Sequence, residues 1–242
     1  MKASNLERSI RTLMGKAIHQ YAMIQDGDRI LVAVSGGKDS VALLHLLMTR
    51  LPRIPISYTL IPVYLEMGYN QNALPFMRDY FQQQSHSTYH VELTDFATFA
   101  HSPQNLKNPC FLCSRMRRKR LFQIAQEHRC NKLAFGHNQD DIIETFFLNT
   151  LYGSVLSTMR PFQPLFEGQI NLIRPLSFIA APVLERFARL KGFPLVHNAC
   201  PSATDSKRTQ VRELLQTLYR SNRKIRGNIF HALQHVDTEY LL

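Results

Sequence analysis

The chain has 242 residues, which is enough to bury one hydrophobic core and short for two full domains. Hydrophobic residues make up 45% and charged residues 19%, as in ordinary globular proteins, and no apolar run reaches the roughly 18 residues that a membrane-spanning helix needs. Lys and Arg number 29 against 18 Asp and Glu. The resulting net charge of +11 speeds encounter with polyanions such as nucleic acids, and it equally fits a basic protein that is merely soluble.

Two further features indicate a reducing compartment. The first eight residues lack the apolar stretch of a signal peptide, so we expect a cytoplasmic protein. Four cysteines are too few for a disulfide scaffold in a chain of this length. We therefore expect free thiols, metal ligands or catalytic groups.

Helix and strand alternate from the start of the chain. Apolar residues at helical spacing predict an amphipathic helix over 6–24. A continuous apolar, β-branched run over 30–34 is typical of a strand that is buried on both faces of a parallel sheet. A helix is expected from Asp39 to Met48, followed by a strand over 58–65 and a helix over 72–83.

The same alternation continues to the C-terminus. The remaining predicted elements are strands over 89–93, 132–136 and 170–173, and helices over 113–128, 140–151, 182–190, 206–219 and 229–236. Strands that alternate with helices predict a doubly wound α/β fold, in which right-handed crossovers join the strands of a parallel sheet.

A polar loop joins the first strand to its helix, with the sequence Ser35-Gly36-Gly37-Lys38-Asp39-Ser40. The two glycines permit a sharp turn and a close approach to a ligand, and the helix N-terminus offers unpaired N–H groups to phosphate oxygens. The two serines add hydroxyl donors, and Lys38 adds positive charge. Asp39 is suited either to bind Mg²⁺ or to cap the helix. The loop therefore predicts a site for nucleotide phosphates.

This loop resembles the PP-loop motif, Ser-Gly-Gly-x-Asp-Ser, of the N-type ATP pyrophosphatase superfamily. The resemblance implies cleavage between the α and β phosphates of ATP, giving an adenylated substrate and pyrophosphate. It also implies a five-stranded sheet in the order 3-2-1-4-5. In such a sheet the first and fourth strands are neighbours at a switch point, where open α/β sheets bind their ligands.

A second polar segment follows the predicted fourth strand and reads Gly136-His137-Asn138-Gln139-Asp140-Asp141. Paired carboxylates after a buried strand are suited to a metal ion or to a capping box on the next helix. Given the superfamily's strand order, Gly136, His137 and Asp141 are expected to line the nucleotide crevice. Asp39 and Asp141 are the candidate Mg²⁺ ligands.

Two cysteines, Cys110 and Cys113, lie at the expected start of a helix, and the basic run of residues 114–120 follows them. Helix N-termini and neighbouring cations both favour thiolate over thiol, so we expect lowered cysteine pKa values here. Cys130 lies between a predicted helix and a predicted strand. It is expected to be a small buried apolar residue.

Three interpretations of the other cysteines remain open on spacing alone. Cys110, Cys113, His197 and Cys200 match the ligand types of a closed zinc site. The Cys-x-x-Cys pair could instead form a redox disulfide. Finally, Cys110, Cys113 and Cys200 could hold an iron–sulfur cluster with one iron left open.

Five segments together resemble the tRNA 2-thiocytidine synthetase family: the 35–40 loop, the 110–120 segment, the 136–141 segment, Ile173-Arg174-Pro175-Leu176 and Cys200. The resemblance extends from about residue 6 to residue 236. It implies that Cys110, Cys113 and Cys200 hold a [4Fe-4S] cluster whose free iron carries the sulfur. These cysteines and Asp39 would then be the catalytic residues. The chain departs from the family in its short C-terminus and in having no second cysteine near Cys200.

The family resemblance implies an enzyme that adenylates the C2 oxygen of a cytidine in tRNA and then replaces that oxygen with sulfur. The expected cofactors are ATP, Mg²⁺ and the [4Fe-4S] cluster. The expected partners are tRNA, a sulfur donor such as a cysteine desulfurase, and a second copy in a homodimer, with no membrane. We expect one domain over 1–242, with an N-terminal helix (1–25), a nucleotide-binding core (26–180) and a helical extension (181–242).

Basic side chains gather in two stretches. Arg115, Arg118 and Lys119 share a helical face, and a second stretch contains Arg220, Arg223, Lys224 and Arg226. Either could be an ordinary solvated face. Together they favour a surface that binds the phosphates of a folded tRNA, from which an unstacked loop base can reach the crevice.

Two other functions use the same loop. A tRNA lysidine synthetase forms the same kind of adenylate and attacks it with an amine, but such an enzyme has no use for the three cysteines. A non-catalytic nucleotide-binding module is disfavoured by the intact phosphate loop.

Overall fold

The structure is a computed structural model that describes residues 3–106, 108–197, 199–203 and 206–240. The strands are β1 (Asp28–Ala33), β2 (Tyr58–Glu66), β3 (His90–Leu93), β4 (Lys132–Phe135), β5 (Phe162–Leu165) and β6 (Ile170–Ile173). They form one sheet in the order β3-β2-β1-β4-β6-β5, in which only β5 runs antiparallel to its neighbour. The predicted α/β fold with a mainly parallel sheet is confirmed.

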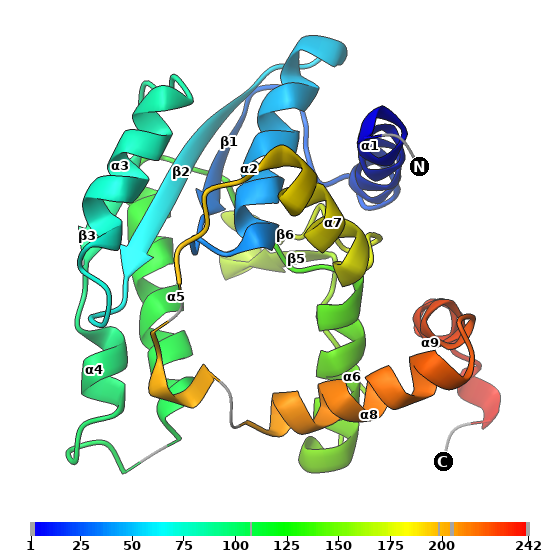
Figure 1. Cartoon of the computed structure of the whole chain (residues 1–242). Coiled ribbons are helices and arrows are strands. Elements are labelled where there is room, and N and C mark those ends of the chain that lie inside the picture. The colour runs from blue at the N-terminus through cyan, green and yellow to red at the C-terminus, as the bar shows by residue number, and fades with distance from the viewer. Residues whose placement is uncertain (1–2, 107, 198, 204–205, 241–242) are drawn as a thin grey trace.

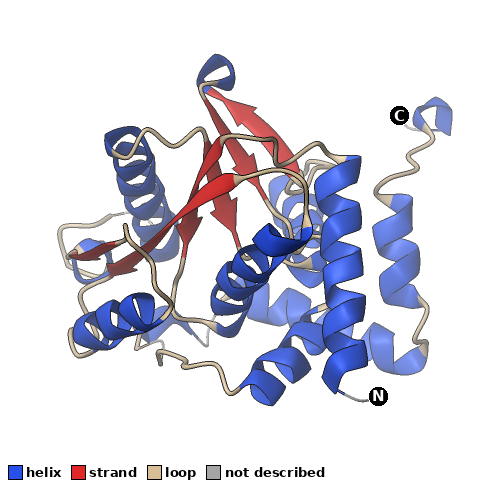
Figure 2. Cartoon of the chain, turned by 90° about the horizontal axis from the view of Figure 1, so that it is seen from above, coloured by secondary structure: helices blue, strands red, loops and turns tan. Residues whose placement is uncertain are grey.

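Helices cover both faces of this sheet (Figures 1 and 2). The α-helices are α1 (Ala3–Gln20), α2 (Lys38–Arg50), α3 (Ala73–Gln83), α4 (Phe96–Ala100), α5 (Pro109–Glu127), α6 (Gln139–Gly153), α7 (Ala181–Lys191), α8 (Lys207–Ser221) and α9 (Ile225–Ala232). Among the described residues, no helix combines the length and the apolarity that a membrane crossing requires.

Successive residues of β1 point into two different cores, as the two-residue period of a strand requires. Ile30 and Val32 pack with α1, α2, α3 and α7 on one face of the sheet. Leu31 packs on the other face, against Leu121 and Ile124 of α5. Burial on both faces explains why β1 is apolar from Ile30 to Ala33.

A third, smaller cluster joins α6 to the C-terminal helices. Ile143 of α6 is fully buried against Val211 and Leu215 of α8, with Phe230 of α9 packed beside them. α8 and α9 therefore lie beyond the sheet, packed against the side of α6 (Figure 1).

The predicted count of five strands is wrong, because β5 was not expected. This strand has only four residues and contains Pro164. Proline cannot donate to the hydrogen-bond ladder and is most easily placed in edge strands, and β5 lies at the edge of the sheet. The predicted fifth strand is β6, between β4 and β5, so the expected order of the five parallel strands holds.

Three helices have bounds that differ from those predicted by four residues at one end or both. α9 spans Ile225–Ala232 rather than residues 229–236. α1 ends at Gln20 rather than at residue 24. Just after its last residue, Ala22 adopts a left-handed conformation (φ 46°), and Met23 N donates to Ile18 O. α5 begins at Pro109, four residues before the predicted start. Its cap explains the difference, because the Asn108 side chain accepts a hydrogen bond from the N–H of Phe111.

A buried polar cluster joins the amino ends of β1 and β4. The Asp28 carboxylate, 4% exposed, accepts hydrogen bonds from Gln25 N and from Asn131 Nδ2, both at 2.7 Å. The ammonium group of Lys132 lies 3.9 Å from the same carboxylate and 5.4 Å from the centre of the Phe162 ring. The cluster lies at the end of the sheet opposite the carboxyl ends of the parallel strands.

We predict that Asp28→Ala lowers the free energy of unfolding by about 3 kcal/mol, because it leaves the buried Lys132 ammonium without its partner. Chemical denaturation measures the change. Asp79→Ala, on the exposed surface of α3, is the matched control and should leave the unfolding midpoint unchanged. Equal effects of the two substitutions would contradict the prediction.

Candidate functional site

A cavity of about 520 Å³ lies at the carboxyl ends of β1, β2 and β4. Its walls come from segments that are far apart in the chain: the 35–40 loop, the end of β2, α5, the 136–141 segment and residues 196, 197, 199 and 200. This is the switch point of the sheet, where β1 and β4 are neighbours. The structure therefore brings together the segments that the sequence singles out.

The phosphate loop has the backbone geometry that its glycines allow. Gly36 has a φ of +76°, and Gly37 is the N-cap of α2. Ser40 closes the loop, because its hydroxyl accepts a hydrogen bond from Ser35 N (3.0 Å) and donates one to Gly37 O (2.8 Å). The Asp39 side chain does not cap the helix. Its carboxylate is thus left for another role.

Val196 packs directly against this loop. Val196 N donates to Gly36 O at 3.0 Å, and a Cβ added at Gly36 would lie 2.6 Å from Val196 Cβ. On the other side, a Cβ at Gly136 would lie 2.9 Å from the backbone carbon of Asp39 and from Ser40 N. Glycine is therefore required at both positions by close packing.

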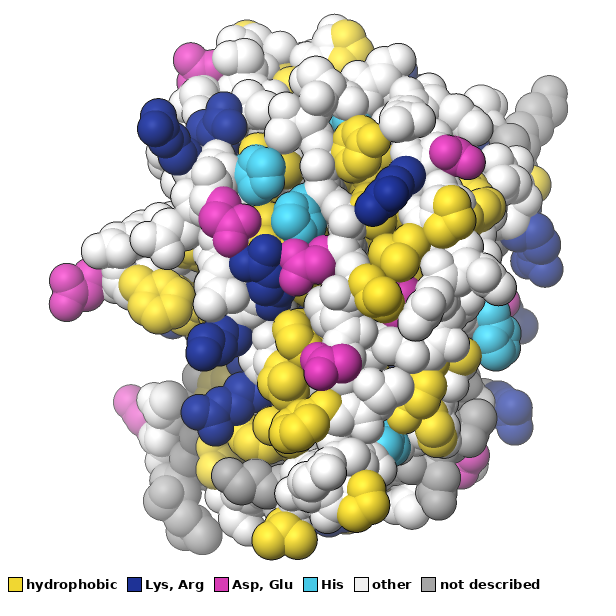
Figure 3. All heavy atoms as spheres, turned by 90° about the vertical axis from the view of Figure 1, so that its left-hand side faces the viewer, with side chains coloured by type: hydrophobic (Ala, Val, Ile, Leu, Met, Phe, Trp, Pro, Cys, Tyr) yellow, Lys and Arg dark blue, Asp and Glu magenta, His cyan; other side chains and the backbone are white. Residues whose placement is uncertain are grey.

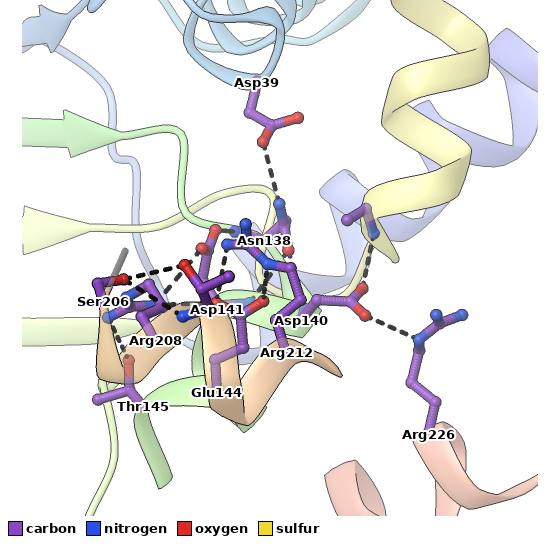
Figure 4. A network of polar contacts seen from close by, with 12 residues as sticks. Asp39, Asn138, Asp140, Asp141, Glu144, Thr145, Ser206, Arg208, Arg212 and Arg226 are labelled. Carbon is purple, nitrogen blue, oxygen red and sulfur yellow. Dashed lines mark hydrogen bonds and ion pairs between the residues drawn. The ribbon is translucent and has the colours of Figure 1, made fainter. Parts of the chain in front are cut away.

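Asn138 connects the two polar segments, as Figure 4 shows. Its side chain donates to Asp39 Oδ2 at 3.1 Å and accepts from the N–H groups of Asp140 and Asp141. Asp141 Oδ2 accepts from Asn138 N in return, which completes a capping box at the start of α6. Asp141 therefore caps the helix and also lines the cavity.

The Asp39 and Asp141 carboxylates, which line the cavity, are desolvated. Burial, together with the charges of Asp141 and Asp140, raises the pKa of Asp39 to about 6, although the Lys38 charge and the hydrogen bond from Asn138 oppose the rise. Burial also raises the pKa of Asp141 above its ordinary value. Asp39 Oδ1 is buried and has no hydrogen-bond partner. An orphaned carboxylate oxygen in a cavity is suited to bind a cation.

His137 is held as a neutral ring. Arg174, from the Ile173–Leu176 segment, donates from Nε to His137 Nδ1 at 3.3 Å. Because a guanidinium can only donate, the ring proton must lie on Nε2. Burial, together with the charges of Arg174 and Arg117, lowers the pKa of His137 to about 3. His137 thus offers the cavity an uncharged N–H donor.

Two of the three proposed cluster cysteines line the cavity. They are Cys113, on α5, and Cys200. Cys110 is exposed, one turn before Cys113 on the same helix, and close enough to affect its pKa. Burial raises the pKa of Cys113, against the opposing charge of Arg117, and the neighbouring Cys200 and Cys110 raise it further. The expectation of a lowered pKa is therefore wrong at Cys113, because desolvation outweighs the nearby cation.

The remaining cysteine behaves as expected. Cys130 is 6% exposed in the core beneath α5, and burial raises its pKa to about 11. His197, the fourth ligand of the zinc interpretation, lines the cavity. Within the described ranges, no group of three or more His, Cys, Asp or Glu side chains is arranged to hold a single metal ion.

The C-terminal helices are fastened to α6 by ion pairs. Glu144, 4% exposed, pairs with Arg208 (3.2 Å) and with Arg212 (2.8 Å) from α8. Asp140 pairs with Arg226 at 2.9 Å and also accepts from Ala181 N. Arg226 therefore forms an ion pair within the protein. The other basic residues of this stretch, Arg220, Arg223 and Lys224, are exposed.

Sequence reasoning did not assign a role to four residues at this site: Tyr69, Arg117, Asn138 and Arg174. Asn138 lies in the 136–141 segment and Arg174 in the Ile173–Leu176 segment. Both segments were identified from the sequence, although these two residues were given no role. Arg117 follows Cys113 by one helical turn, a spacing that puts both on one face of α5. Tyr69 belongs to a loop after β2 that Glu66 orders by accepting from the N–H groups of residues 69 and 70.

Comparisons with known proteins agree with this site. A family model described as the PP-loop domain matches residues 3–218. A tRNA-cytidine(32) 2-sulfurtransferase from Citrifermentans bemidjiense is 36% identical over 236 residues, which cover 96% of this chain and 92% of that protein. Another, from Geotalea daltonii, is 37% identical over 244 residues, which cover 98% of this chain and 95% of that protein.

Among solved structures, a U34-tRNA thiolase from Methanococcus maripaludis, determined with its [4Fe-4S] cluster, has the same fold. It superposes with a TM-score of 0.76 at 22% identity, covering 96% of this chain and 80% of that chain. The two sulfurtransferases are similar to this chain over nearly its whole length, and this similarity establishes the family. The chain belongs to the PP-loop family and, within it, to the tRNA-cytidine(32) 2-sulfurtransferase family.

Proposed function

We propose that the chain is an ATP-dependent tRNA sulfurtransferase that converts cytidine 32 of tRNA to 2-thiocytidine. The observation that carries this proposal is one cavity lined by both the phosphate loop and two cysteines, Cys113 and Cys200. Adenylation needs the first feature and sulfur delivery needs the second. An amine-transferring PP-loop enzyme would need only the phosphate loop.

In the first step, the cytidine C2 oxygen attacks the α phosphorus of ATP, an O–P bond forms, and pyrophosphate leaves. The N–H groups at the start of α2 and the Lys38 ammonium are oriented to bind the departing phosphates. The neutral His137 supplies a further donor from Nε2. In the second step, sulfide attacks C2, and the C2–O bond breaks with release of AMP.

Mg²⁺ fits the acidic side of the cavity. Asp39 Oδ1 has no partner within the protein, and the Asp141 carboxylate lies close enough to raise its pKa. Oxygen ligands of this kind suit Mg²⁺, which would neutralise phosphate charge there. We therefore propose Asp39 and Asp141 as its protein ligands.

A [4Fe-4S] cluster fits the thiol side. Cys113 and Cys200 line one cavity, and Cys110 is one helical turn from Cys113. A four-iron cluster is larger than a single ion and spaces its ligands more widely. Ligation by three cysteines leaves one iron available to bind the sulfur that is transferred. Arg117, on the same face of α5 as Cys113, offsets the negative charge of such a site.

Substrate tRNA is proposed to contact the exposed basic residues of α5 and of the α8–α9 region. On the side of the molecule formed by α3, β3 and α4, Lys and Arg side chains lie among Asp and Glu side chains rather than in a separate patch (Figure 3). Arg120 is an example, since it pairs with Glu92 and Glu127 at 2.8 Å each. The free cations Arg115, Arg118 and Lys119 are better candidates for phosphate contacts.

Several expectations extend this proposal. A sulfur donor such as a cysteine desulfurase would resupply the sulfide, and the homodimer and the cytoplasmic location remain predictions. The ion pairs between α6 and the C-terminal helices support the proposal that residues 1–242 act as one PP-loop domain.

We predict opposite effects of Asp39→Asn on activity and on stability. Loss of the carboxylate should abolish ATP-dependent pyrophosphate release. Because the folded-state pKa of Asp39 is raised to about 6, the folded protein loses stability as the pH rises from about 4 through about 6. Without Mg²⁺ and nucleotide, Asp39→Asn should therefore raise the thermal midpoint at pH 7.5 and leave it unchanged at pH 4. Wild-type pyrophosphate release by the variant would contradict the assignment.

The cluster ligands are tested by single substitutions in protein purified without oxygen. Cys110→Ala, Cys113→Ala and Cys200→Ala should each lose bound iron and 2-thiocytidine formation, measured by mass spectrometry of tRNA nucleosides. Each should keep ATP binding, because the phosphate loop is separate. The matched control, Cys130→Ala, should keep both 2-thiocytidine formation and ATP binding. Stoichiometric zinc that is lost on His197→Ala would instead support the structural zinc site.

The basic surface is tested through the salt dependence of tRNA binding. Substituting Arg115, Arg118 and Lys119 together by Ala should lower the slope of log Kd against log salt by about 2, because each phosphate contact releases counterions. A control variant removes the same charge from exposed arginines of α1, α3 and α7, at Arg8, Arg78 and Arg189. Equal slopes for the two variants would identify the α5 residues as a solvated face.

A further inference from the structure

The chain that carries Cys200 has little regular structure of its own. Between the end of α7 and the start of α8, the described residues contain only the short 3₁₀ turn Pro201–Ala203. A ligand held on such a segment needs contacts from elsewhere in the fold to fix its position. Contacts made by this segment therefore decide where the Cys200 thiol lies.

Two contacts fix the segment before Cys200. Val196 N donates to Gly36 O at 3.0 Å, and the Asn70 side chain donates to His197 O at 3.4 Å. These tie the segment to the phosphate loop and to the loop after β2. Both contacts lie before Cys200. The chain at and after Cys200 must therefore be positioned by other contacts.

A third contact lies just beyond Cys200. His101, the C-cap residue of α4, has its ring Nε2 at 2.7 Å from Ser202 Oγ. Its Nδ1 lies 2.8 Å from Ala97 O. Because a carbonyl oxygen can only accept, Nδ1 carries the ring proton. In the neutral ring Nε2 is then the acceptor, and the Ser202 hydroxyl donates to it.

The imidazole ring is itself held in place. The Tyr69 ring packs edge-on against it, with 6.0 Å between ring centroids, and the Tyr69 hydroxyl is directed to Ala97 O at 3.4 Å. Burial raises the pKa of Tyr69, and so do the charges of Cys200 and Cys113, which indicates that the phenol lies near both thiols. Tyr69 also lines the cavity. The His101 ring is thus fixed from two sides before it meets Ser202.

We propose that His101 is a positioning residue for Cys200: through its hydrogen bond to Ser202 it holds the Cys200 thiol on the cavity wall that Cys113 shares. The inference relies on the proposed function in one respect, which is that a three-cysteine cluster needs all three thiols in place. The structural evidence for it is the His101–Ser202 contact. His101 is not among the residues that line the cavity, and its proposed action is through Ser202.

The distance between the two thiols can be tested without any cluster. In full-length protein carrying Cys110→Ser and Cys130→Ser, Cys113 and Cys200 are the only thiols. Phenylarsine oxide condenses with two adjacent thiols to a cyclic dithioarsinite with release of one water, and it binds single thiols weakly. Its affinity for this parent protein therefore reports how well Cys113 and Cys200 are held together.

His101→Ala and Ser202→Ala should each weaken phenylarsine oxide binding about threefold to tenfold, the range that loss of one net hydrogen bond produces. The double variant should be no weaker than either single variant, since both remove the same interaction. His101→Gln and Ser202→Thr keep the acceptor and the hydroxyl, and they should bind as the parent does. His90→Ala, which removes another 2.7 Å side-chain contact, to Glu92 on β3, is the matched control and should have no effect.

Parent-like binding by Ser202→Ala would overturn the proposal, and so would effects that add in the double variant. If His101→Ala fails to fold, Ser202→Ala and its comparison with Ser202→Thr still decide the question. A second measurement, with all native cysteines and anaerobic reconstitution, is the rate at which a chelator removes iron. That rate should rise in Ser202→Ala and not in His90→Ala. If the unsubstituted protein binds no iron, the proposed function fails, while the arsenical result still decides the role of His101.

Discussion

Two glycines, one in the phosphate loop and one facing it, occupy positions where a Cβ atom would collide with a neighbouring segment. One is Gly36, against which Val196 packs, and the other is Gly136, against which the backbone of Asp39 and Ser40 packs. These contacts bring three chain segments to van der Waals distance at the carboxyl ends of β1 and β4. The Asn138–Asp39 hydrogen bond depends on the second contact, and the path of the chain toward Cys200 depends on the first. Close backbone packing thus assembles the cavity before any ligand is bound.

The charges that line the cavity follow from the same packing. Desolvation raises the pKa of Asp39 and Cys113 and lowers that of His137, so each group is shifted toward its neutral form. A bound cation would reverse the shifts of the two acidic groups. Mg²⁺ would favour ionised Asp39, and iron would favour the Cys113 thiolate with release of a proton. The acidic groups of the site are therefore suited to cationic ligands, while His137 stays an uncharged donor.

Local sequence patterns were enough to predict the elements that carry the phosphate site. β1, its loop and α2 are continuous in the chain, and their apolar periodicity and glycines are read directly. β5 escaped prediction because Gln163 and Pro164 interrupt its four residues, unlike the apolar pattern of the equally short β6. α4 escaped because five residues make fewer than two helical turns. The meeting of Cys200 with Cys113 is different. It depends on packing between residues 87 positions apart, and only the family resemblance implied it.

Contacts between distant side chains lay beyond sequence reasoning for the same reason. His101 and Ser202 are 101 residues apart, and Arg226 and Asp140 are 86 apart. Arg226 illustrates the consequence, because a basic residue in a basic stretch reads as a free cation until its partner is known. A pattern of residue types shows which groups are present, whereas burial and pairing decide which of them remain free to bind a ligand.

The ion pairs of α6 connect the proposed tRNA surface to the nucleotide site. The first turn of α6 carries Asp141 in the cavity, and one turn later Glu144 holds Arg208 and Arg212 of α8. Because Glu144 is buried and its partners are charged, breaking these pairs would leave an uncompensated charge in the core. α8 is thereby kept in a fixed orientation relative to Asp141. A phosphate backbone bound along the C-terminal helices would then lie in a constant register to the cavity, which is the geometric requirement for presenting one loop base to the phosphate loop.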